Sequence, residues 1–98
     1  MPRSNTESAT DLLLEEPKLC EVIILNDNWT TMEFVVDILV KIFDKNFNDA
    51  KNIMLRIHEE GLGVCGIYPY DIAELKVKLT RERARKEGHP LRIETREV

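Results

Sequence analysis

A strand, a turn and the start of a helix are encoded in VIILNDNWTTMEFVV, residues 22–36. The β-branched run from Val22 to Leu25 is typical of a buried strand. The polar residues Asn26 to Asn28 end that strand and turn the chain. The pattern from Thr30 to Glu33 fits a capping box, in which a Thr hydroxyl and a Glu side chain satisfy free backbone donors. This segment therefore predicts that a helix begins directly after the turn.

Apolar residues at helical spacing extend this first helix to about Asp44. The residues that recur at this spacing are Phe34, Val35, Ile38, Leu39, Ile42 and Phe43. Asn46 to Asn48 supplies a turn and an N-cap for a second helix. Gly61 is the natural C-terminal stop of that helix, because glycine readily adopts the left-handed conformation found there.

A second strand, a third helix and a last strand complete the pattern. The segment 63–68 is short, apolar and flanked by glycine, which favours a buried strand. Pro69 suits the first turn of a helix that ends at Gly88. We expect its core positions to be Ile72, Leu75, Val77 and Leu79. Residues 90–95 alternate in polarity and predict the last strand.

The element order β-α-α-β-α-β predicts an α+β fold. We expect a small sandwich in which three helices pack on one face of a three-stranded antiparallel sheet. The first strand begins near Lys18, so residues 18–98 form the core domain. Residues 1–17 are polar apart from Leu12 to Leu14, and we expect them to be a flexible extension.

Composition limits what this domain can do. The chain of 98 residues carries a net charge of -4 and has a pI near 5.2, which disfavours a nucleic-acid binder. No apolar run is long enough to span a membrane and no signal pattern is present, so we expect a cytoplasmic protein that binds no membrane. A cationic cluster lies where cations favour a helix C-terminus, and it comprises Arg81, Arg83, Arg85 and Lys86.

Polar acceptors and apolar side chains converge if the first two helices pack together. The side-chain oxygens of Asn26 to Asn28 can accept hydrogen bonds from a protonated amine, and a neutral His58 adds another acceptor. Apolar residues share helix faces with this histidine or face it, and these are Met32, Val35, Met54 and Ile57. Such a site suits a ligand with one charged and one hydrophobic end.

The combination of motifs resembles the ClpS adaptor proteins of the bacterial N-degron pathway. The resemblance covers about residues 18–93. It is carried by Leu25 to Val36, Met54 to His58, Gly63 to Gly66, Ala73-Glu74, Lys76-Val77 and His89-Pro90-Leu91.

The resemblance implies an adaptor with no catalytic activity. Such an adaptor recognises proteins by a free α-amino group and a bulky N-terminal residue, typically Leu, Phe, Tyr or Trp. It delivers them to a Clp AAA+ unfoldase and its peptidase for degradation. The implied partners are the N-terminal segments of substrates and the N-terminal domain of a ClpA-type or ClpC-type unfoldase. We expect a monomer with no cofactor and no metal.

The resemblance also implies roles for individual residues. It assigns contact with the substrate amino group to Asn26, Asp27, Asn28 and His58. It assigns the side-chain pocket to Ile24, Leu25, Thr30, Met32, Val35, Met54, Ile57 and Leu91, with Met32 as a gatekeeper against β-branched residues. It assigns contact with the unfoldase to Asp71 and Lys76, with Glu74 close by, and engagement during hand-over to residues 1–17.

Two residues depart from the family pattern. Asn28 stands where the family usually carries Asp, so the amide keeps an acceptor oxygen but loses the charge. We hypothesise weaker or more selective amine binding, partly compensated by Asp27, and hence a possible specialised paralogue with narrowed specificity. Leu75 stands where a Thr is expected, which leaves the details of the unfoldase contact open.

Other interpretations of the same residues stay open. Asn26 to Asn28 can be plain turn residues, and the apolar stripes can be ordinary core. An enzyme using His58 as a general base lacks a compact motif for a nucleophile or metal. Cys20 and Cys65 are too few for a disulfide framework and are expected in the core, and with His58 and His89 they lack the close spacing of zinc ligands. An interaction module related to the C-terminal domain of the ribosomal stalk remains the other class.

Overall fold

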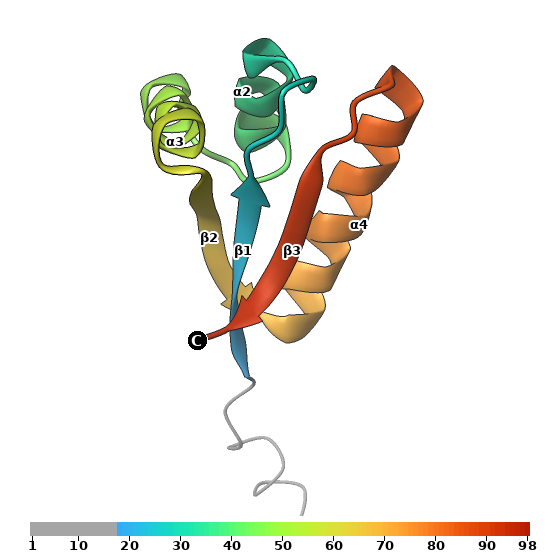
Figure 1. Cartoon of the computed structure of the whole chain (residues 1–98). Helices are drawn as coiled ribbons and strands as arrows, with labels where there is room; N and C mark the ends of the chain where they lie inside the picture. Colours follow the sequence, from blue (N-terminus) through green and yellow to red (C-terminus); the bar gives the residue numbers. More distant parts are fainter. Residues whose placement is uncertain (1–17) are drawn as a thin grey trace, which may run out of the picture.

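The computed structural model describes residues 18–98, and the expected flexible extension, residues 1–17, lies outside the described residues. The described elements follow the order β-α-α-β-α-β, which confirms the sequence prediction (Figure 1). They are β1 (Leu19–Leu25), α2 (Met32–Lys41), α3 (Phe47–Glu60), β2 (Leu62–Pro69), α4 (Tyr70–Glu87) and β3 (Arg92–Glu97).

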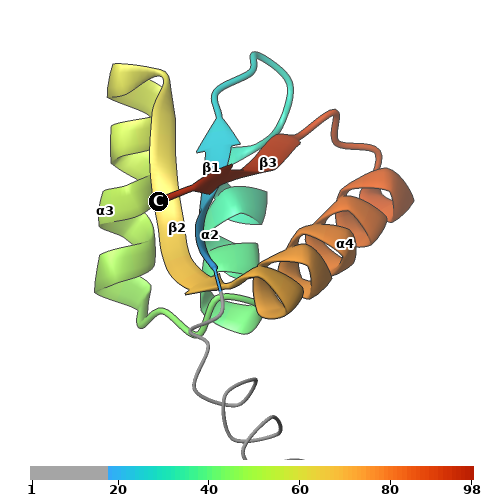
Figure 2. The ribbon, with the colours of Figure 1, turned by 90° about the horizontal axis from the view of Figure 1, so that it is seen from below.

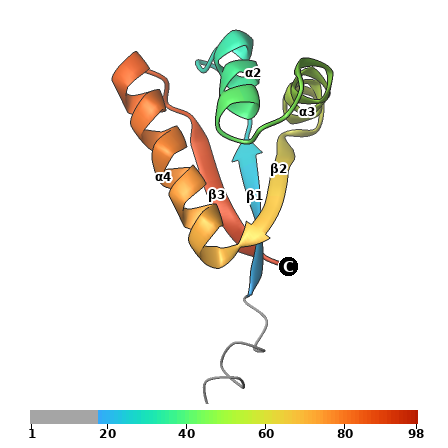
Figure 3. The same ribbon diagram turned by 180° about the vertical axis from the view of Figure 1, so that it is seen from behind.

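The sheet is antiparallel and has the strand order β2-β1-β3. Its central strand β1 places Ile24 opposite Gly63 of β2 and Ile93 of β3. The helices lie on one side of the sheet, as the views from below and from behind show (Figures 2 and 3). Ile24 is fully buried in the core between the sheet and the helices. Both predicted core cysteines, Cys20 and Cys65, are buried there.

The helix ends lie near the predicted signals, but α2 ends at Lys41 rather than near Asp44, and its start is shifted by one residue. Asn46 caps α3 by accepting a 2.8 Å hydrogen bond from the Asp49 amide, and Gly61 ends it with a φ of 93°. The cap of α2 is Thr31, whose hydroxyl accepts a 3.2 Å bond from the Phe34 amide. The predicted capping box began one residue earlier, at Thr30. The hydroxyl of Thr30 instead donates to the carboxylate of Asp27, so it is engaged in the preceding loop.

The prediction for the third helix was wrong at three of its four core positions. Val77 is buried, but Ile72, Leu75 and Leu79 are 43%, 51% and 42% exposed. The buried residues of α4 are Ala73, Val77, Thr80 and Ala84. Small side chains let the helix lie close to the sheet. The hydroxyl of Thr80 donates a 2.8 Å hydrogen bond to the Lys76 carbonyl within the helix. This bond offsets the cost of burying a polar group.

Candidate functional site

The loop between β1 and α2 is organised by one carboxylate. Asp27 accepts hydrogen bonds from the backbone amides of Trp29 and Thr30, at 2.8 and 2.7 Å, and from the Thr30 hydroxyl at 2.7 Å. Partial burial opposes ionisation of this group, but the hydrogen bonds from Thr30 and Trp29 and the charge of Arg92 together lower its pKa. Asp27 is therefore ionised, and its carboxylate is bonded within the loop. These bonds hold the backbone that carries Asn26 and Asn28.

The end of α3 is tied to the end of β1. The Asn26 amide donates a 2.9 Å hydrogen bond to the Gly61 carbonyl. Gly63, two residues further on, leaves room for α3, because a Cβ there would stand 2.7 Å from Cγ1 of Ile57. This close approach, together with the turn at Gly61, brings the last turn of α3 and its His58 beside the loop after β1.

The loop and the two helices α2 and α3 together enclose a hollow of about 220 Å³. Its lining combines polar groups of the loop with apolar side chains of the helices. The lining residues are Asn26, Asp27, Asn28, Thr30, Met32, Val35, Met54, Ile57 and His58. All four residues predicted to bind an amine and five of the eight predicted pocket residues thus line one hollow.

The lining has two parts, a buried apolar wall and a solvent-exposed polar rim. Val35, Met54 and Ile57 are buried, whereas Asn28 and His58 are exposed to solvent. A ligand can therefore place an apolar group against the wall while its polar end stays at the rim. That arrangement matches the geometry expected for a ligand with one charged and one hydrophobic end.

The remaining predicted pocket residues do not line this hollow. Ile24 is fully buried in the core. Leu25 and Leu91 instead line a separate hollow of about 320 Å³, together with Arg92. Their assignment to a substrate pocket therefore stays a prediction.

Two residues that support the site were not singled out from the sequence as part of it. Arg92, at the start of β3, donates a 3.0 Å hydrogen bond to the Asn26 carbonyl and adds positive charge near Asp27. Gly61 was predicted only as a helix stop, but its carbonyl also anchors the loop. Neither role has a local sequence signal, because both depend on contacts between residues far apart in the chain.

The residues predicted to contact an unfoldase lie on α4. Asp71 and Glu74 are exposed and three residues apart, so they share a helix face. Lys76 faces the turn after α2, and its side chain is only 16% exposed. Its ammonium donates a 2.5 Å hydrogen bond to the Ile42 carbonyl and lies 3.7 Å from the Asp44 carboxylate. Lys76 is thus already engaged within the domain.

Other chemistry finds little support in the described part of the chain. Burial raises the pKa of the Cys65 thiol to about 12, so this cysteine is not a thiolate nucleophile. Within residues 18–98 no three His, Cys, Asp or Glu side chains lie close enough together to hold a metal ion. No helix of this range is long and apolar enough to cross a membrane.

Comparison with known proteins connects this geometry to one class of proteins. Residues 15–94 match the family "ATP-dependent Clp protease adaptor protein ClpS". The ATP-dependent Clp protease adapter protein ClpS of Helicobacter hepaticus is 50% identical over 98 residues, which cover 100% of this chain and 99% of that protein. The Wolinella succinogenes protein of the same name is 51% identical over 87 residues, which cover 89% of this chain and 85% of that protein.

A solved structure agrees with this match. Agrobacterium tumefaciens ClpS2, bound to L-phenylalaninamide, superposes with a TM-score of 0.81 and is 32% identical. The alignment covers 85% of this chain and 100% of that one. The fold and these relatives define an adaptor protein that serves a protease. The chain belongs to the ClpS family of Clp protease adaptors, whose members present substrates rather than catalyse a reaction.

Proposed function

We propose that this adaptor recognises substrate proteins by their free N-terminus. In this proposal the hollow between the loop and helices α2 and α3 receives the first residue, with its α-ammonium at the rim and its side chain against the wall. The preferred residues are Leu, Phe, Tyr and Trp. The observation that carries the proposal is the single hollow that joins polar acceptors with a buried apolar wall.

The rim supplies suitable partners for an ammonium group. Asn26 and Asn28 each carry an amide oxygen, and a neutral His58 offers one ring nitrogen. A hydrogen bond to a charged group contributes about 1.5–3 kcal/mol when well formed. The carboxylate of Asp27 accepts three hydrogen bonds from the loop, so its contribution to the ammonium is mainly its charge.

The wall suits one large apolar side chain. A volume of about 220 Å³ is below the range of about 300–1,000 Å³ that is typical of sites for drug-sized ligands. Burial of one Leu or Phe side chain against the wall contributes about 1.5–3 kcal/mol. Met32 lines the hollow and is 42% exposed. We propose that it disfavours a β-branched first residue.

Support also comes from the ligand of the related structure. L-Phenylalaninamide, to which Agrobacterium tumefaciens ClpS2 is bound, carries a free α-amino group and an aromatic side chain. These are the two groups that the rim and the wall, respectively, are proposed to bind.

Delivery requires a second surface. We propose that Asp71 and Glu74 on the exposed face of α4 contact the N-terminal domain of a ClpA-type or ClpC-type unfoldase, with Lys76 holding the adjacent turn. We also propose that the adaptor acts in the cytoplasm as a monomer. In this arrangement the amine site and the proposed unfoldase surface belong to different elements, so both can be occupied together.

A peptide-binding series tests recognition of the N-terminus. Peptides that differ only at the first residue are measured by fluorescence anisotropy, each with a free and an acetylated amino group. We expect Leu, Phe, Tyr and Trp to bind more tightly than Ala. Acetylation removes the charge and donors and should weaken binding about tenfold or more.

Protein variants complete the series. His58→Ala and Met32→Ala should change affinity and side-chain selectivity respectively, whereas Glu59→Ala, next to the histidine and outside the hollow, should change neither. If acetylated and free peptides bind equally, the chain is an interaction module without amine recognition. If the four bulky residues bind no better than Ala, the proposed specificity is wrong.

A further inference from the structure

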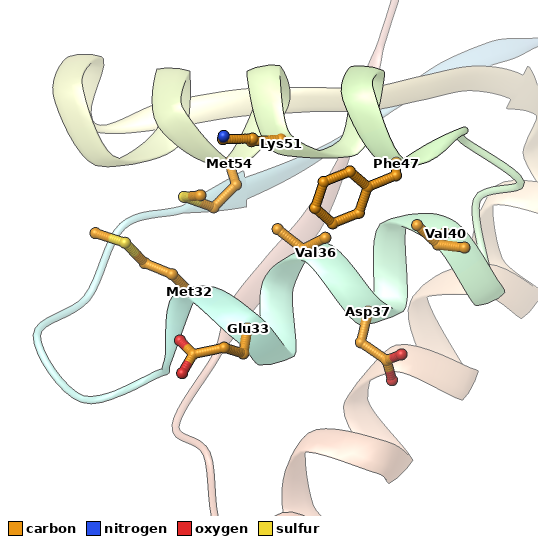
Figure 4. Close-up of a pocket in the computed structure, with 8 residues that line it drawn as sticks. All are labelled: Met32, Glu33, Val36, Asp37, Val40, Phe47, Lys51 and Met54. Atoms are coloured by element: carbon orange, nitrogen blue, oxygen red, sulfur yellow. The ribbon is translucent and has the colours of Figure 1, made fainter.

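A second, larger depression lies beside the proposed amine site. Helices α2 and α3 leave a groove of about 480 Å³ between them (Figure 4). Its lining is mostly apolar, with charged groups on its edges. The residues that line it are Met32, Glu33, Val36, Asp37, Val40, Phe47, Lys51 and Met54. Phe47 is 63% exposed, so the groove leaves a large aromatic surface in contact with water.

The groove is continuous with the proposed amine site. Met32 and Met54 line both depressions, so they form the wall that the two share. Their side chains lie at one end of the groove, and Phe47 and Val40 lie at the other (Figure 4). Methionine side chains are flexible and adapt to different neighbours. A chain that enters the amine site can therefore pass these two residues and continue along the groove.

The charges along the groove favour an apolar occupant over a charged one. Hydrogen bonds from Arg83 and Lys41 lower the pKa of Asp37, whose carboxylate lies 2.8 Å from Arg83. Its charge is therefore already compensated. Glu33 and Lys51 have no ion-pair partner among residues 18–98, and they come from opposite helices with opposite charges. The charged residues at the edges of the groove therefore give little preference for an occupant of either charge.

We propose that this groove receives an apolar side chain of the third residue of the bound N-terminal segment. The proposal rests on the proposed function, because it takes the first residue to occupy the neighbouring hollow. In an extended chain alternate side chains point to the same side, and residues one and three are separated by about 6.6 Å. If residue one faces the adaptor, residue three faces it too, whereas residue two points away.

The consequence is a specificity that reaches beyond the N-terminal residue. The adaptor reads a free amine, a bulky first side chain and an apolar third side chain. Substrates with Leu, Phe or Met at the third position are held more tightly than substrates with Ala, Asp or Lys there.

Three peptides with free amino groups test this inference. They begin Leu-Ala-Ala, Leu-Ala-Leu and Leu-Leu-Ala and are otherwise identical. We expect Leu-Ala-Leu to bind the unmodified adaptor about threefold to tenfold more tightly than Leu-Ala-Ala, the range expected for partial burial of a leucine side chain. Leu-Leu-Ala should gain less than twofold.

Two groove variants and a matched control show where the gain arises. Phe47→Ala and Val36→Thr remove apolar lining without touching either shared methionine, and both should abolish the gain while leaving the affinity for Leu-Ala-Ala unchanged. Ile67→Ala removes a comparably exposed apolar side chain from β2, outside the groove, and should keep the gain.

The outcomes separate this inference from the function on which it rests. If Leu-Ala-Ala binds no better than its acetylated form, amine recognition fails and this inference fails with it. If Leu-Ala-Ala binds by its amine but the third Leu adds nothing, or if both groove variants keep the gain, this inference alone is wrong. Self-association that Phe47→Ala abolishes, without any gain from the third Leu, would assign the groove to a second copy of the chain.

Discussion

The backbone amide of Asn26 donates a 2.9 Å hydrogen bond to the carbonyl of Gly61. This bond joins the end of β1 to the end of α3, two segments separated by the whole of α2. Asn26 and His58 line the same hollow because their segments are joined in this way. The geometry of the proposed amine site therefore depends on a backbone contact as much as on the side chains that form its rim.

Replacing Gly61 tests this dependence. Gly61 has a φ of 93°, and an added Cβ would meet no atom within 4 Å, so Gly61→Ala introduces backbone strain without a clash. We expect a loss of about 1–2 kcal/mol in the free energy of unfolding, measured in urea. Gly88→Ala is a matched control, since Gly88 has a φ of 78° and similar free space at the end of α4. Both variants should lose stability, but only Gly61→Ala should weaken peptide binding.

The carboxylate of Asp27 should stabilise the fold in a pH-dependent manner. Its pKa is lowered from the ordinary value of 3.8, so the ionised form stabilises the native state. Its contribution is complete above the unfolded pKa and is lost as the pH falls through the lower native value. We expect Asp27→Asn to reduce the free energy of unfolding by about 1–3 kcal/mol near pH 7, because a charged acceptor of three hydrogen bonds is lost.

The pH profile separates this charge effect from a simple loss of packing. The stability difference between the unmodified protein and Asp27→Asn should shrink below about pH 4, where the unfolded chain takes up a proton. Chemical unfolding at several pH values measures this difference. A difference that stays constant down to acidic pH would contradict the role assigned to the charge.

The sequence predicted the elements because their signals are local, whereas the hollow was predicted only on the condition that the first two helices pack together. The β-branched run after Glu21, the helical spacing after Thr31 and the left-handed glycine at Gly61 each act within a few residues. The packing face of α4 was not predictable in this way. Ile72 and Leu75 carry a stronger apolar signal than Ala73, yet close packing against the sheet selected the small residue. Periodicity identifies a helix but cannot rank two apolar stripes on it.

The same limit applied within the site. Thr30 and Thr31 carry the same side chain and are adjacent, yet the Thr30 hydroxyl bonds to Asp27 while the Thr31 hydroxyl caps α2. The resemblance assigned Leu25 and Leu91 to the pocket, whereas in the structure both line a separate hollow, so their assignment to the substrate pocket stays a prediction.

Variants of α4 can separate residues that stabilise the fold, such as Lys76, from residues proposed to bind the unfoldase. Its ammonium lies 5.1 Å from the centre of the Tyr68 ring and is bonded to the Ile42 carbonyl, which holds the turn after α2. Lys76→Met keeps the apolar stem but leaves that carbonyl without its partner. We expect a loss of about 1–3 kcal/mol in the free energy of unfolding. Asp71→Asn and Glu74→Gln should leave stability within about 0.5 kcal/mol, because both side chains are exposed.

The same variants are then measured for binding to the N-terminal domain of an unfoldase. Asp71→Asn and Glu74→Gln should weaken this binding while peptide affinity is unchanged. If either variant binds the unfoldase domain normally, the exposed face of α4 is not the delivery surface. If Lys76→Met unfolds at the same denaturant concentration as the unmodified protein, the assignment of Lys76 to the turn is wrong.

Asn28 is the position where affinity should be easiest to raise. It lies exposed at the rim of the hollow, and its amide oxygen can accept a hydrogen bond but carries no formal charge. Asn28→Asp adds a carboxylate beside the proposed ammonium site, and charge-assisted hydrogen bonds are roughly twice as strong as neutral ones. We expect peptides with a free amino group to bind about threefold to tenfold more tightly, with no change for acetylated peptides.

A matched control distinguishes a local contact from the general effect of added charge. Asn52→Asp introduces the same charge on α3, in a separate hollow with Lys45 and Arg56, and should leave peptide affinity unchanged. Raising the salt concentration should reduce the gain from Asn28→Asp only in part, because a direct hydrogen bond is screened less than a distant charge. Equal gains from both variants would show that the adaptor attracts the amine through its overall charge, and unchanged binding by Asn28→Asp would show that Asn28 does not contact it.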